Sequence, residues 1–291
     1  MKYEAAYHRD DSKRRAFNTL SRLVFGLDFE PFYESGWWDD SFICHTLFEG
    51  NKAVSNVSVT KMRFMIRGRE METLQLGTVM THPDYRGKGL ARELMLRITK
   101  AYEGQASFRF LFANDSVTDF YPRYGFYERP RFLFSCPLVL SGNRAGKFRF
   151  LNLEKTEDRR ILESCLSARI PVSDLFSLVT GESITLFHAL YLFRDSLLFD
   201  EEENGILIVR QEGQTLHLYD AIYSRKISWT DYFEKLPFSG AGEALFHFTP
   251  ATAGIQGGVW QIEAEEDDHF FVDAPPGLLP EKFSFPATGR T

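Results

Sequence analysis

The chain has 291 residues, which is enough for one large domain or two domains of ordinary size. Hydrophobic residues make up 44% and aromatic residues 15% of the sequence, so there is ample material for a buried core. The net charge of −6 argues against non-specific nucleic-acid binding by the chain as a whole. The three cysteines are far apart and lack CxxC spacing, so neither a disulfide framework nor a bound metal is expected.

Two further features of the sequence bear on where the protein works. Residues 1–11 lack the apolar run of a signal peptide. The longest apolar stretch, around 184–193, contains a histidine and is too short to span a bilayer. We therefore expect a cytoplasmic protein that binds neither membrane nor nucleic acid, and the sequence leaves a homo-oligomer open.

Positive charge is concentrated in one segment. Residues 61–100 carry nine Lys or Arg against four acidic residues, although the whole chain is acidic. Such a patch suits a small anionic ligand better than a polymer, and a solvated charged face explains the composition equally well. The motif inside this segment distinguishes the two interpretations.

Hydrophobic spacing and turn residues predict the elements of the first half. Apolar residues recur at helical spacing in 11–27 and again in 90–102. Gly77 interrupts the third strand and predicts a bulge or a close backbone approach. In chain order we expect a helix at 11–27, strands at 42–48, 53–64 and 72–80, a helix at 90–102, a strand at 108–112, a short helix at 115–123 and an extended stretch at 125–140.

The second half repeats this coarse order after a small, polar linker at 141–147. We therefore interpret it as a diverged structural repeat of the first half. The tail from residue 273 contains four prolines and is expected to be irregular. The elements predicted here are a helix at 157–168, strands at 196–199, 205–211 and 215–223, a helix at 229–236 and a strand at 244–249.

The most informative segment is 77–91, where a strand, a glycine-bracketed loop and a helix follow one another directly. The first N–H groups of a helix lack intrahelical partners and lie at the positive end of its dipole, so they bind anions. Gly87 and Gly89 allow close backbone approach, and Arg86 and Lys88 add charge. The P-loop pattern GxxxxGK[ST] does not occur, and an arginine stands where a dinucleotide fingerprint needs a small residue.

Residues 86–91 match the R/Q-x-x-G-x-G/A pattern in motif A of the GCN5-related N-acetyltransferases, the GNAT superfamily. Residues 114–126 resemble the family's N-x-x-A-x-x-x-Y-x-x-x-G-F pattern, with Val117 at the usual alanine. The resemblance implies an α+β fold in which helices flank a mixed, mostly antiparallel sheet. It covers about residues 1–140, which would form the catalytic domain. Residues 141–291 would then form a second α/β domain, a degenerate GNAT-like repeat.

The same resemblance implies a binding mode for coenzyme A. Backbone amides of the loop would hold the pyrophosphate, and the end of the preceding strand would hydrogen-bond the pantetheine arm. Tyr121 would lie by the sulfur and protonate the leaving thiolate, unless it is only a packed aromatic residue. Asn114 would anchor the cofactor or cap the following helix. The residues expected to contact the cofactor are Val79, Met80, Thr81, Arg86, Gly87, Lys88, Gly89, Leu90, Ala91 and Asn114.

The attacking amine needs to lose its proton. Near pH 7.4 only about a thousandth of a lysine-like amine is neutral, which costs ~4 kcal/mol, and a general base would offset part of this. The family often uses a carboxylate on the strand that corresponds to 72–80, where Glu72 is the only acid. His82 is the second candidate base. The simpler alternatives are an exposed edge charge for Glu72 and a structural role for His82.

The segment between the first helix and the sheet, where the family builds its acceptor pocket, combines acids with indoles. This combination suits a cationic amine through charge pairing and cation–π contact. A surface loop anchored by its aromatic residues is the alternative. The candidate acceptor-binding residues are Glu34, Trp37, Trp38, Asp39 and Asp40.

Together these features predict an N-acyltransferase that moves an acetyl group from acetyl-CoA to a primary amine. The amine would attack directly in a ternary complex, without a metal. The acceptor would be a small-molecule or peptide amine, such as a polyamine, an aminoglycoside-like compound, a lysine side chain or an N-terminus. Two alternatives stay open: a protein N-acetyltransferase with an open cleft, and a non-catalytic acyl-CoA-binding or sensing module.

Overall fold

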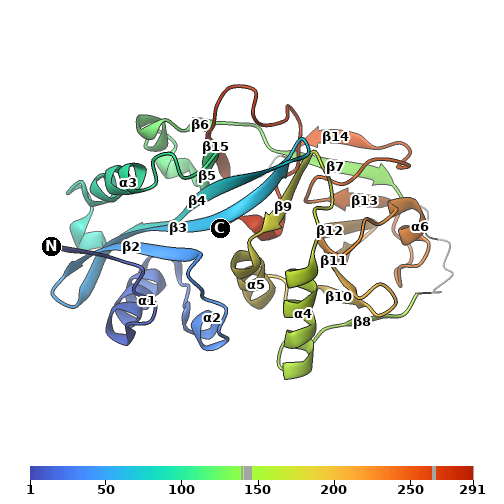
Figure 1. The fold of residues 1–291 in the computed structure, drawn as a ribbon, viewed down its shortest axis with the longest axis horizontal. Coiled ribbons are helices and arrows are strands. Elements are labelled where there is room, and N and C mark those ends of the chain that lie inside the picture. The colour runs from blue at the N-terminus through green and yellow to red at the C-terminus, as the bar shows by residue number, and fades with distance from the viewer. Residues whose placement is uncertain (139, 141–145, 264–266, 291) are drawn as a thin grey trace.

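The computed structural model describes residues 1–138, 140, 146–263 and 267–290. Two β-sheets with flanking helices make up this part of the chain (Figure 1). The first sheet contains, in spatial order, β1 (Lys2–Ala5), β2 (Phe42–Glu49), β3 (Lys52–Ile66), β4 (Arg69–Thr81), β5 (Phe108–Ala113), β15 (His269–Asp273) and β6 (Tyr127–Glu128), and β9 (Phe176–Thr180) pairs with the far end of β3.

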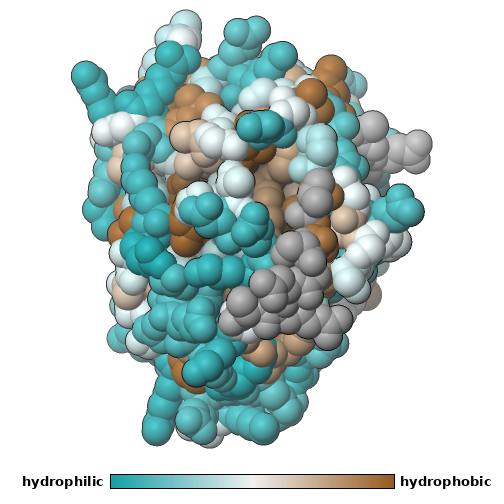
Figure 2. Space-filling view, turned by 90° about the vertical axis from the view of Figure 1, so that its right-hand side faces the viewer, coloured by the Kyte–Doolittle hydropathy of each residue, from teal (hydrophilic) through white to brown (hydrophobic). Residues whose placement is uncertain are grey.

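The second sheet lies to the right of the first in Figure 1. Figure 2 views the molecule from this end, where hydrophilic residues cover most of the face and hydrophobic residues lie between them in small groups. Apolar residues scattered in this way are ordinary for a solvated surface. In spatial order the sheet contains β14 (Val259–Ile262), β7 (Phe132–Pro137), β13 (Glu243–Phe246), β12 (Thr215–Ile222), β11 (Gly205–Glu212), β10 (Leu197–Asp200) and β8 (Phe148–Phe150).

Helices cover both faces of the first sheet, with α1 (Asp11–Phe25) and α3 (Leu90–Ala101) on opposite sides (Figure 1). The Asp10 side chain caps α1 by accepting the N–H of Lys13 at 3.2 Å, and Gly26 ends the helix in the left-handed conformation. The other helices are α2 (Glu30–Glu34), α4 (Thr156–Ala168), α5 (Glu182–Tyr191) and α6 (Trp229–Phe233), and the short 3-10 helices are η1 (Pro83–Tyr85), η2 (Asp115–Val117), η3 (Tyr121–Tyr124) and η4 (Ala287–Gly289).

The two halves of the chain share one succession of elements. Three antiparallel strands are followed by a helix and a strand parallel to the third, as β2-β3-β4-α3-β5 and as β10-β11-β12-α6-β13. The predicted mixed, mostly antiparallel fold with flanking helices is therefore confirmed. The interpretation of the second half as a diverged repeat rests on this shared order and stays a prediction.

Three strands cross between the halves. β9 and β15 come from the second half but pair in the first sheet, whereas β7 comes from the first half and pairs in the second sheet. A boundary near residue 140 therefore does not separate the sheets cleanly, and the expected division of the chain stays a prediction. Most of the expected linker, residues 141–145, lies outside the described residues.

One local expectation was wrong. Residues 115–123 form two short 3-10 helices rather than one α-helix, because Pro122, near the end of the segment, lacks a backbone donor and its ring would clash with the carbonyl four residues earlier in an α-helix. The apolar stretch at 184–193, for which no element was predicted, contains most of α5. Within the part of the chain that the structure describes, no helix is long and apolar enough to cross a bilayer.

Helix α5 packs against the segment that joins α1 to β2. The rings of Phe29 and Phe187 stack with their centroids 5.3 Å apart. The Tyr191 hydroxyl donates to the carbonyl of Asp28 at 2.6 Å, and the Ser183 hydroxyl donates to the carbonyl of Trp37 at 3.0 Å. The largest cluster of buried apolar residues accordingly contains side chains from both halves of the chain. This packing places α5 at the edge of the candidate site.

Two buried histidines make the fold sensitive to acid. His45 on β2 lies between the hydroxyls of Tyr3 and Tyr102, at 2.7 and 3.0 Å. His188 on α5 hydrogen-bonds the backbone carbonyl of Arg290. Burial lowers the pKa of each imidazole to about 4. Both histidines are therefore neutral in the folded protein near neutral pH.

We predict that stability falls as the pH drops from about 6.5 to about 4, because the unfolded chain binds these protons first. Each histidine contributes up to about 3 kcal/mol to this loss of unfolding free energy. His45→Gln removes one titrating group, so its melting temperature should depend less on pH across this interval than that of the unmodified protein. Thermal unfolding at a series of pH values measures the difference, and an identical pH dependence in the two proteins contradicts the prediction.

Candidate active site

A cavity of about 940 Å³ lies where β4 and β5 separate. These strands pair in parallel only over residues 73–75 and 108–110 and then diverge. Gly77 to Thr81, at the end of β4, line one side of the cavity, and the end of β5 with η2 and Tyr121 lines the other. The cavity continues to the C-terminal ends of α1 and α5. The sheet thus opens on the face where the glycine-rich loop follows β4.

A β-bulge deforms β4 beside the cavity, as Gly77 in this strand predicted. The register of β3 and β4 shifts between Asn56 and Ser58, where two residues of β4 oppose one of β3. Thr78 has a φ of +47°, which is uncommon for a residue other than glycine. The buried Asn56 amide donates to the Thr78 carbonyl at 3.0 Å, and its oxygen accepts the Thr46 hydroxyl at 2.7 Å. This local loss of pairing turns the end of β4 into a backbone surface that an extended ligand can use.

The loop between β4 and α3 has the backbone geometry of an anion site. Gly87 and Gly89 have φ values of +74° and +77°, in the left-handed region that favours glycine. A Cβ added at either position would meet no atom within 4 Å, so the space in front of the loop is open. Gly89 precedes α3, and no side chain caps this helix. The N–H groups of its first turn are therefore available to an anion.

Cationic side chains flank this loop. The Arg86 guanidinium donates to the Thr81 carbonyl at 3.3 Å and lines the cavity. The Lys88 ammonium lies 4.6 Å from the centroid of the Tyr85 ring. Both cations are exposed to solvent, so their charge adds to that of the helix N-terminus without the desolvation penalty of a buried ion.

The structure brings the residues predicted to contact a cofactor to one place. Gly87, Lys88 and Gly89 lie in the loop between Arg86 and Ala91, which both line the cavity. The Leu90 side chain is buried in the core beneath α3. Their roles toward a cofactor stay predictions. The predicted residues that line the cavity itself are Val79, Met80, Thr81, Arg86, Ala91 and Asn114.

Tyr121 begins η3 and lines the same cavity. Its ring packs against the rings of Phe120, Phe126 and Phe271, and the residue is 4% exposed. Burial raises the pKa of the Tyr121 hydroxyl to about 12, so it keeps its proton near neutral pH. Within the described residues no hydrogen bond uses this hydroxyl, which leaves it available to a ligand.

Asn114 lies between β5 and η2, at the N-cap position of η2. Its side-chain oxygen accepts the Ser116 hydroxyl at 2.6 Å and makes no capping bond to the backbone. Asn114 fixes the local turn at the wall of the cavity. Its role toward a cofactor stays a prediction.

Neither candidate general base lines the cavity. Glu72 is exposed near the start of β4 and lies 4.0 Å from the Nε of Arg63 on the neighbouring strand. His82 accepts the backbone N–H of Asp84 at 3.3 Å, and its ring packs edge-on against Tyr85. These contacts agree with the simpler alternatives, an edge charge and a structural residue that shapes η1.

One carboxylate lines the cavity within the described part of the chain, and it belongs to Asp268. Its oxygen lies 2.5 Å from the Arg131 guanidinium and 3.4 Å from that of Arg290. Glu263 contacts the same two groups, at 2.6 Å from Arg131 and 3.9 Å from Arg290, so two cations balance two anions. The Asp268 carboxylate is therefore not free to act as a base.

The acid-rich and indole-rich segment expected to bind the acceptor lies away from the cavity. The two indoles are buried as structural anchors: Trp37 donates to a Glu163 oxygen at 2.7 Å, and Trp38 donates to the Phe42 carbonyl at 3.1 Å. The exposed Asp39 carboxylate accepts the Ser41 hydroxyl at 2.5 Å, and that of Asp40 pairs with Arg9 at 3.1 Å. None of the five predicted residues lines the cavity, namely Glu34, Trp37, Trp38, Asp39 and Asp40.

The second half of the chain supplies walls that the sequence did not predict. They face the C-terminal end of α1 across the cavity, so residues more than 150 positions apart meet there. The apolar stretch at 184–193 indicated buried residues, but no local signal placed them beside β4. The unpredicted lining residues of the second half are Phe187, His188, Tyr191, Leu192, Asp268 and Arg290.

The first part of the chain matches a known protein family. Residues 8–129 match the family model described as Acetyltransferase (GNAT) domain. This part of the chain is a GNAT domain. The match includes the glycine-rich loop and Tyr121, and it ends before the strands of the second sheet. No curated protein matches the sequence.

Solved structures share the fold of this GNAT domain and of the second sheet. A probable N-acyltransferase from Enterococcus faecalis V583 has a TM-score of 0.60 at 12% identity, over 93% of this chain and 71% of that chain. Eis1 from Mycobacterium abscessus has a TM-score of 0.59 at 10% identity, over 93% and 73%. A GCN5-related N-acetyltransferase from Kribbella flavida has a TM-score of 0.55 at 14% identity, over 94% and 73%. At these identities the likeness shows the fold alone.

We predict that Asn56→Ala lowers the free energy of unfolding by about 1–3 kcal/mol, because it removes a buried amide and leaves the half-buried Thr78 carbonyl without its side-chain donor. Asn51→Ala is the matched control, since Asn51 is exposed in the turn after β2, and it should change stability by less than about 0.5 kcal/mol. Chemical denaturation measures both values. Equal losses in the two variants would show that Asn56 does not hold the bulge.

Proposed function

We propose that this protein is an N-acyltransferase that moves an acetyl group from acetyl-CoA to a primary amine of a small molecule or peptide. One observation carries the proposal: a single cavity connects the free amides at the start of α3 with the buried, protonated hydroxyl of Tyr121. An anion site and a proton donor on one cavity suit a phosphorylated thioester. The GNAT match over residues 8–129 supports the same chemistry.

In this proposal the pyrophosphate of coenzyme A lies against the first turn of α3. The positive end of the helix and the cations of Arg86 and Lys88 attract it. The pantetheine arm follows the bulged end of β4, where Val79 and Thr81 offer backbone groups, and Asn114 faces it from the other wall. The thioester then lies next to Tyr121. The proposed reaction uses no metal.

The reaction consists of one bond formed and one broken at the same carbon. The lone pair of the neutral amine attacks the thioester carbonyl carbon and forms the C–N bond. The C–S bond then breaks, and the sulfur leaves with the electron pair. The nitrogen must lose a proton and the sulfur must gain one, so a group that touches both can serve both needs.

The pKa of Tyr121, about 12, decides how it takes part. A thiol with a pKa near 8.5 is the stronger acid, so a one-way proton transfer from the tyrosine would be uphill by ~5 kcal/mol. A relay avoids this cost, because the hydroxyl gives its proton to the sulfur while it takes one from the cationic nitrogen. Tyr121 therefore acts as a hydrogen-bond donor and a proton relay rather than as a reservoir of acid.

We also infer that cofactor binding belongs to residues 1–140 and that residues 141–291 have lost it. In the second half, β12 leads toward α6 through residues 223–228, which contain no glycine. None of these residues has a positive φ, so the backbone there lacks the left-handed turns that open the loop before α3. The second half contributes the walls of the cavity instead.

We predict that Gly89→Asp abolishes acetyl-CoA binding, because it puts a carboxylate in front of the amides that bind the pyrophosphate. Gly213→Asp is the matched control: Gly213 also has a positive φ, +59°, and open space around it, but it lies in the turn between β11 and β12. Isothermal titration calorimetry should detect binding to the unmodified protein and to the control only. Unchanged affinity of Gly89→Asp for acetyl-CoA would show that the coenzyme does not bind at this loop.

We predict that Tyr121→Phe lowers turnover by roughly tenfold or more and leaves acetyl-CoA affinity nearly unchanged, since it removes the proton relay and keeps the ring packing. Tyr124→Phe is the matched control from the same short helix, and Tyr124 does not line the cavity. Thiol release with a panel of amines measures turnover. Full activity in Tyr121→Phe would assign the proton to another group, and binding without any thiol release would favour the non-catalytic alternative.

A further inference from the structure

The two ends of the cavity differ in chemistry, and the end between α1 and α5 indicates what the acceptor is. We infer that the acceptor is an amine carried on an aromatic or compact apolar body, and not a polycation. The inference rests on the proposed function, in which coenzyme A binds at the other end of the cavity. The end that is left for the amine is the one that the second half of the chain completes.

This acceptor end is apolar over most of its surface. Val24 and Leu27 from the end of α1 face Phe187 and Tyr191 from α5 across it. Two large apolar side chains stand at its edge exposed to solvent, Phe25 at 50% and Leu192 at 57%. An apolar ligand that covers such a rim gains about 25 cal/mol for each Å² of apolar surface removed from water.

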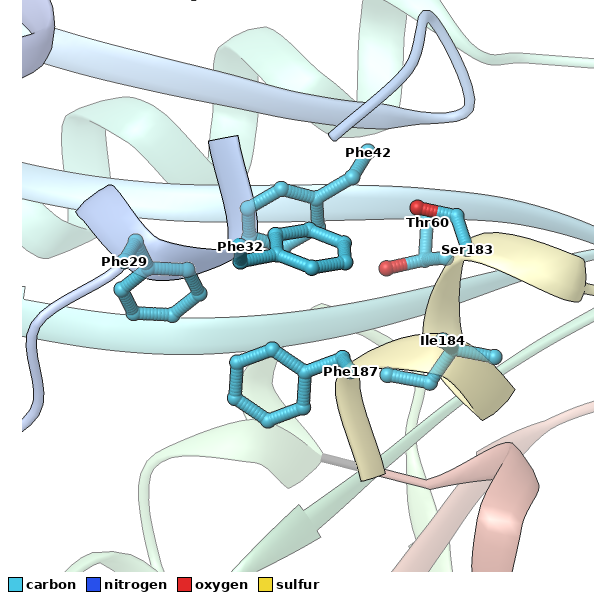
Figure 3. A pocket seen from close by; sticks show the side chains of 7 residues that line it. All are labelled: Phe29, Phe32, Phe42, Thr60, Ser183, Ile184 and Phe187. Carbon is cyan, nitrogen blue, oxygen red and sulfur yellow. The ribbon is translucent and has the colours of Figure 1, made fainter. Parts of the chain in front are cut away.

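The aromatic residues at this end pack on one another and form an apolar wall that suits a ring. Phe29 stacks on Phe187 with centroids 5.3 Å apart, and Phe187 lies 4.7 Å from Tyr191. Phe29 and Phe187 also line a small void behind the cavity, of about 10 Å³, on which side chains of β2, β3 and α5 converge (Figure 3). Its exposed lining is apolar, so it suits movement of these rings better than a bound water.

Charge at this end disfavours a polycation. The pKa of His188 is lowered to about 4 and that of Tyr191 is raised to about 12, both by burial, so both side chains are neutral near pH 7. Asp268 already pairs with two arginines, Arg131 and Arg290, and Glu263 contacts the same two guanidinium groups. A polyamine would have to desolvate several ammonium groups here without finding an uncompensated carboxylate among the described lining residues.

The same surroundings favour an amine with one nitrogen. An apolar wall lowers the pKa of an ammonium ion and so raises the fraction that can attack. A single amine on a ring meets this requirement, because the ring packs on the aromatic wall and the nitrogen alone enters the site. The acidic segment that suggested a cationic acceptor contributes nothing to this balance, since it lies outside the cavity.

The test compares amines that differ in the apolar body and in charge. With acetyl-CoA as donor, initial rates of thiol release are measured for 2-phenylethylamine, tryptamine, n-propylamine and spermidine. The ratio kcat/KM should be at least roughly tenfold higher for the two aromatic amines than for n-propylamine and spermidine, since tenfold corresponds to only ~1.4 kcal/mol of added binding. Acetyl-CoA binding is measured on the same sample by calorimetry.

Variants at the exposed rim assign the selectivity to this end. Leu192→Glu should lower kcat/KM for 2-phenylethylamine and raise it for spermidine, because it adds an uncompensated carboxylate. Leu192→Gln has nearly the same size and no charge, so it should lower the first value without raising the second. Leu96→Glu is the matched control, since Leu96 is 52% exposed on α3 outside this cavity, and it should change neither.

The results separate this inference from the proposed function. A preference of the unmodified protein for spermidine would overturn the inference, and acetyl-CoA binding with thiol release would leave the proposed function standing. The inference would also be overturned if all four amines reacted equally well and long-chain acyl-CoA donors gave higher rates than acetyl-CoA. In that case the apolar end would bind the acyl chain and not the amine. Failure to bind acetyl-CoA would overturn both.

Discussion

The early end of the parallel pairing between β4 and β5 is the constraint on which the site depends. The ladder stops at Gln75 and Phe110, and the bulge at Thr78 lies just beyond on β4. A continuous ladder would close the sheet here and engage its amides. The two separated ends are held from outside, β4 by the Asn56 amide and β5 by pairing with β15. The opening is therefore built into the sheet and not into a loop.

The second half of the chain completes a cavity that the first half begins. Strands β9 and β15 join the first sheet, and α5 docks beside α1. Asp220 on β12 forms a buried ion pair with Arg169 at 2.9 Å. The same carboxylate accepts the Thr288 hydroxyl and so attaches η4 to β12. This attachment brings Arg290 to the wall. In the proposed function the cofactor and the acceptor are thus recognised by different parts of the chain, which lets acceptor selectivity change without disturbing the loop before α3.

Local patterns predicted the elements that depend on neighbouring residues, and contacts between distant residues account for the errors. The helix predicted at 11–27, the bulge near Gly77 and the loop before α3 all follow from nearby residue types. The acid-rich segment looked like a binding site because its sequence does not reveal that Trp37 bonds Glu163, 126 positions away. Likewise, nothing near β15 or α5 in the sequence specifies which strand or helix each one meets.

Desolvation links the proton donor and the acceptor in the proposed site. The burial that raises the pKa of Tyr121 also opposes an ammonium ion beside it, because both effects disfavour charge in a medium of low dielectric. A neutral tyrosine and a neutral amine are the forms that the relay needs. A carboxylate facing the nitrogen would stabilise the ammonium ion and hold back its proton. The compensation of Asp268 by Arg131 and Arg290 therefore agrees with amine transfer, in which the apolar wall does part of what a general base would do.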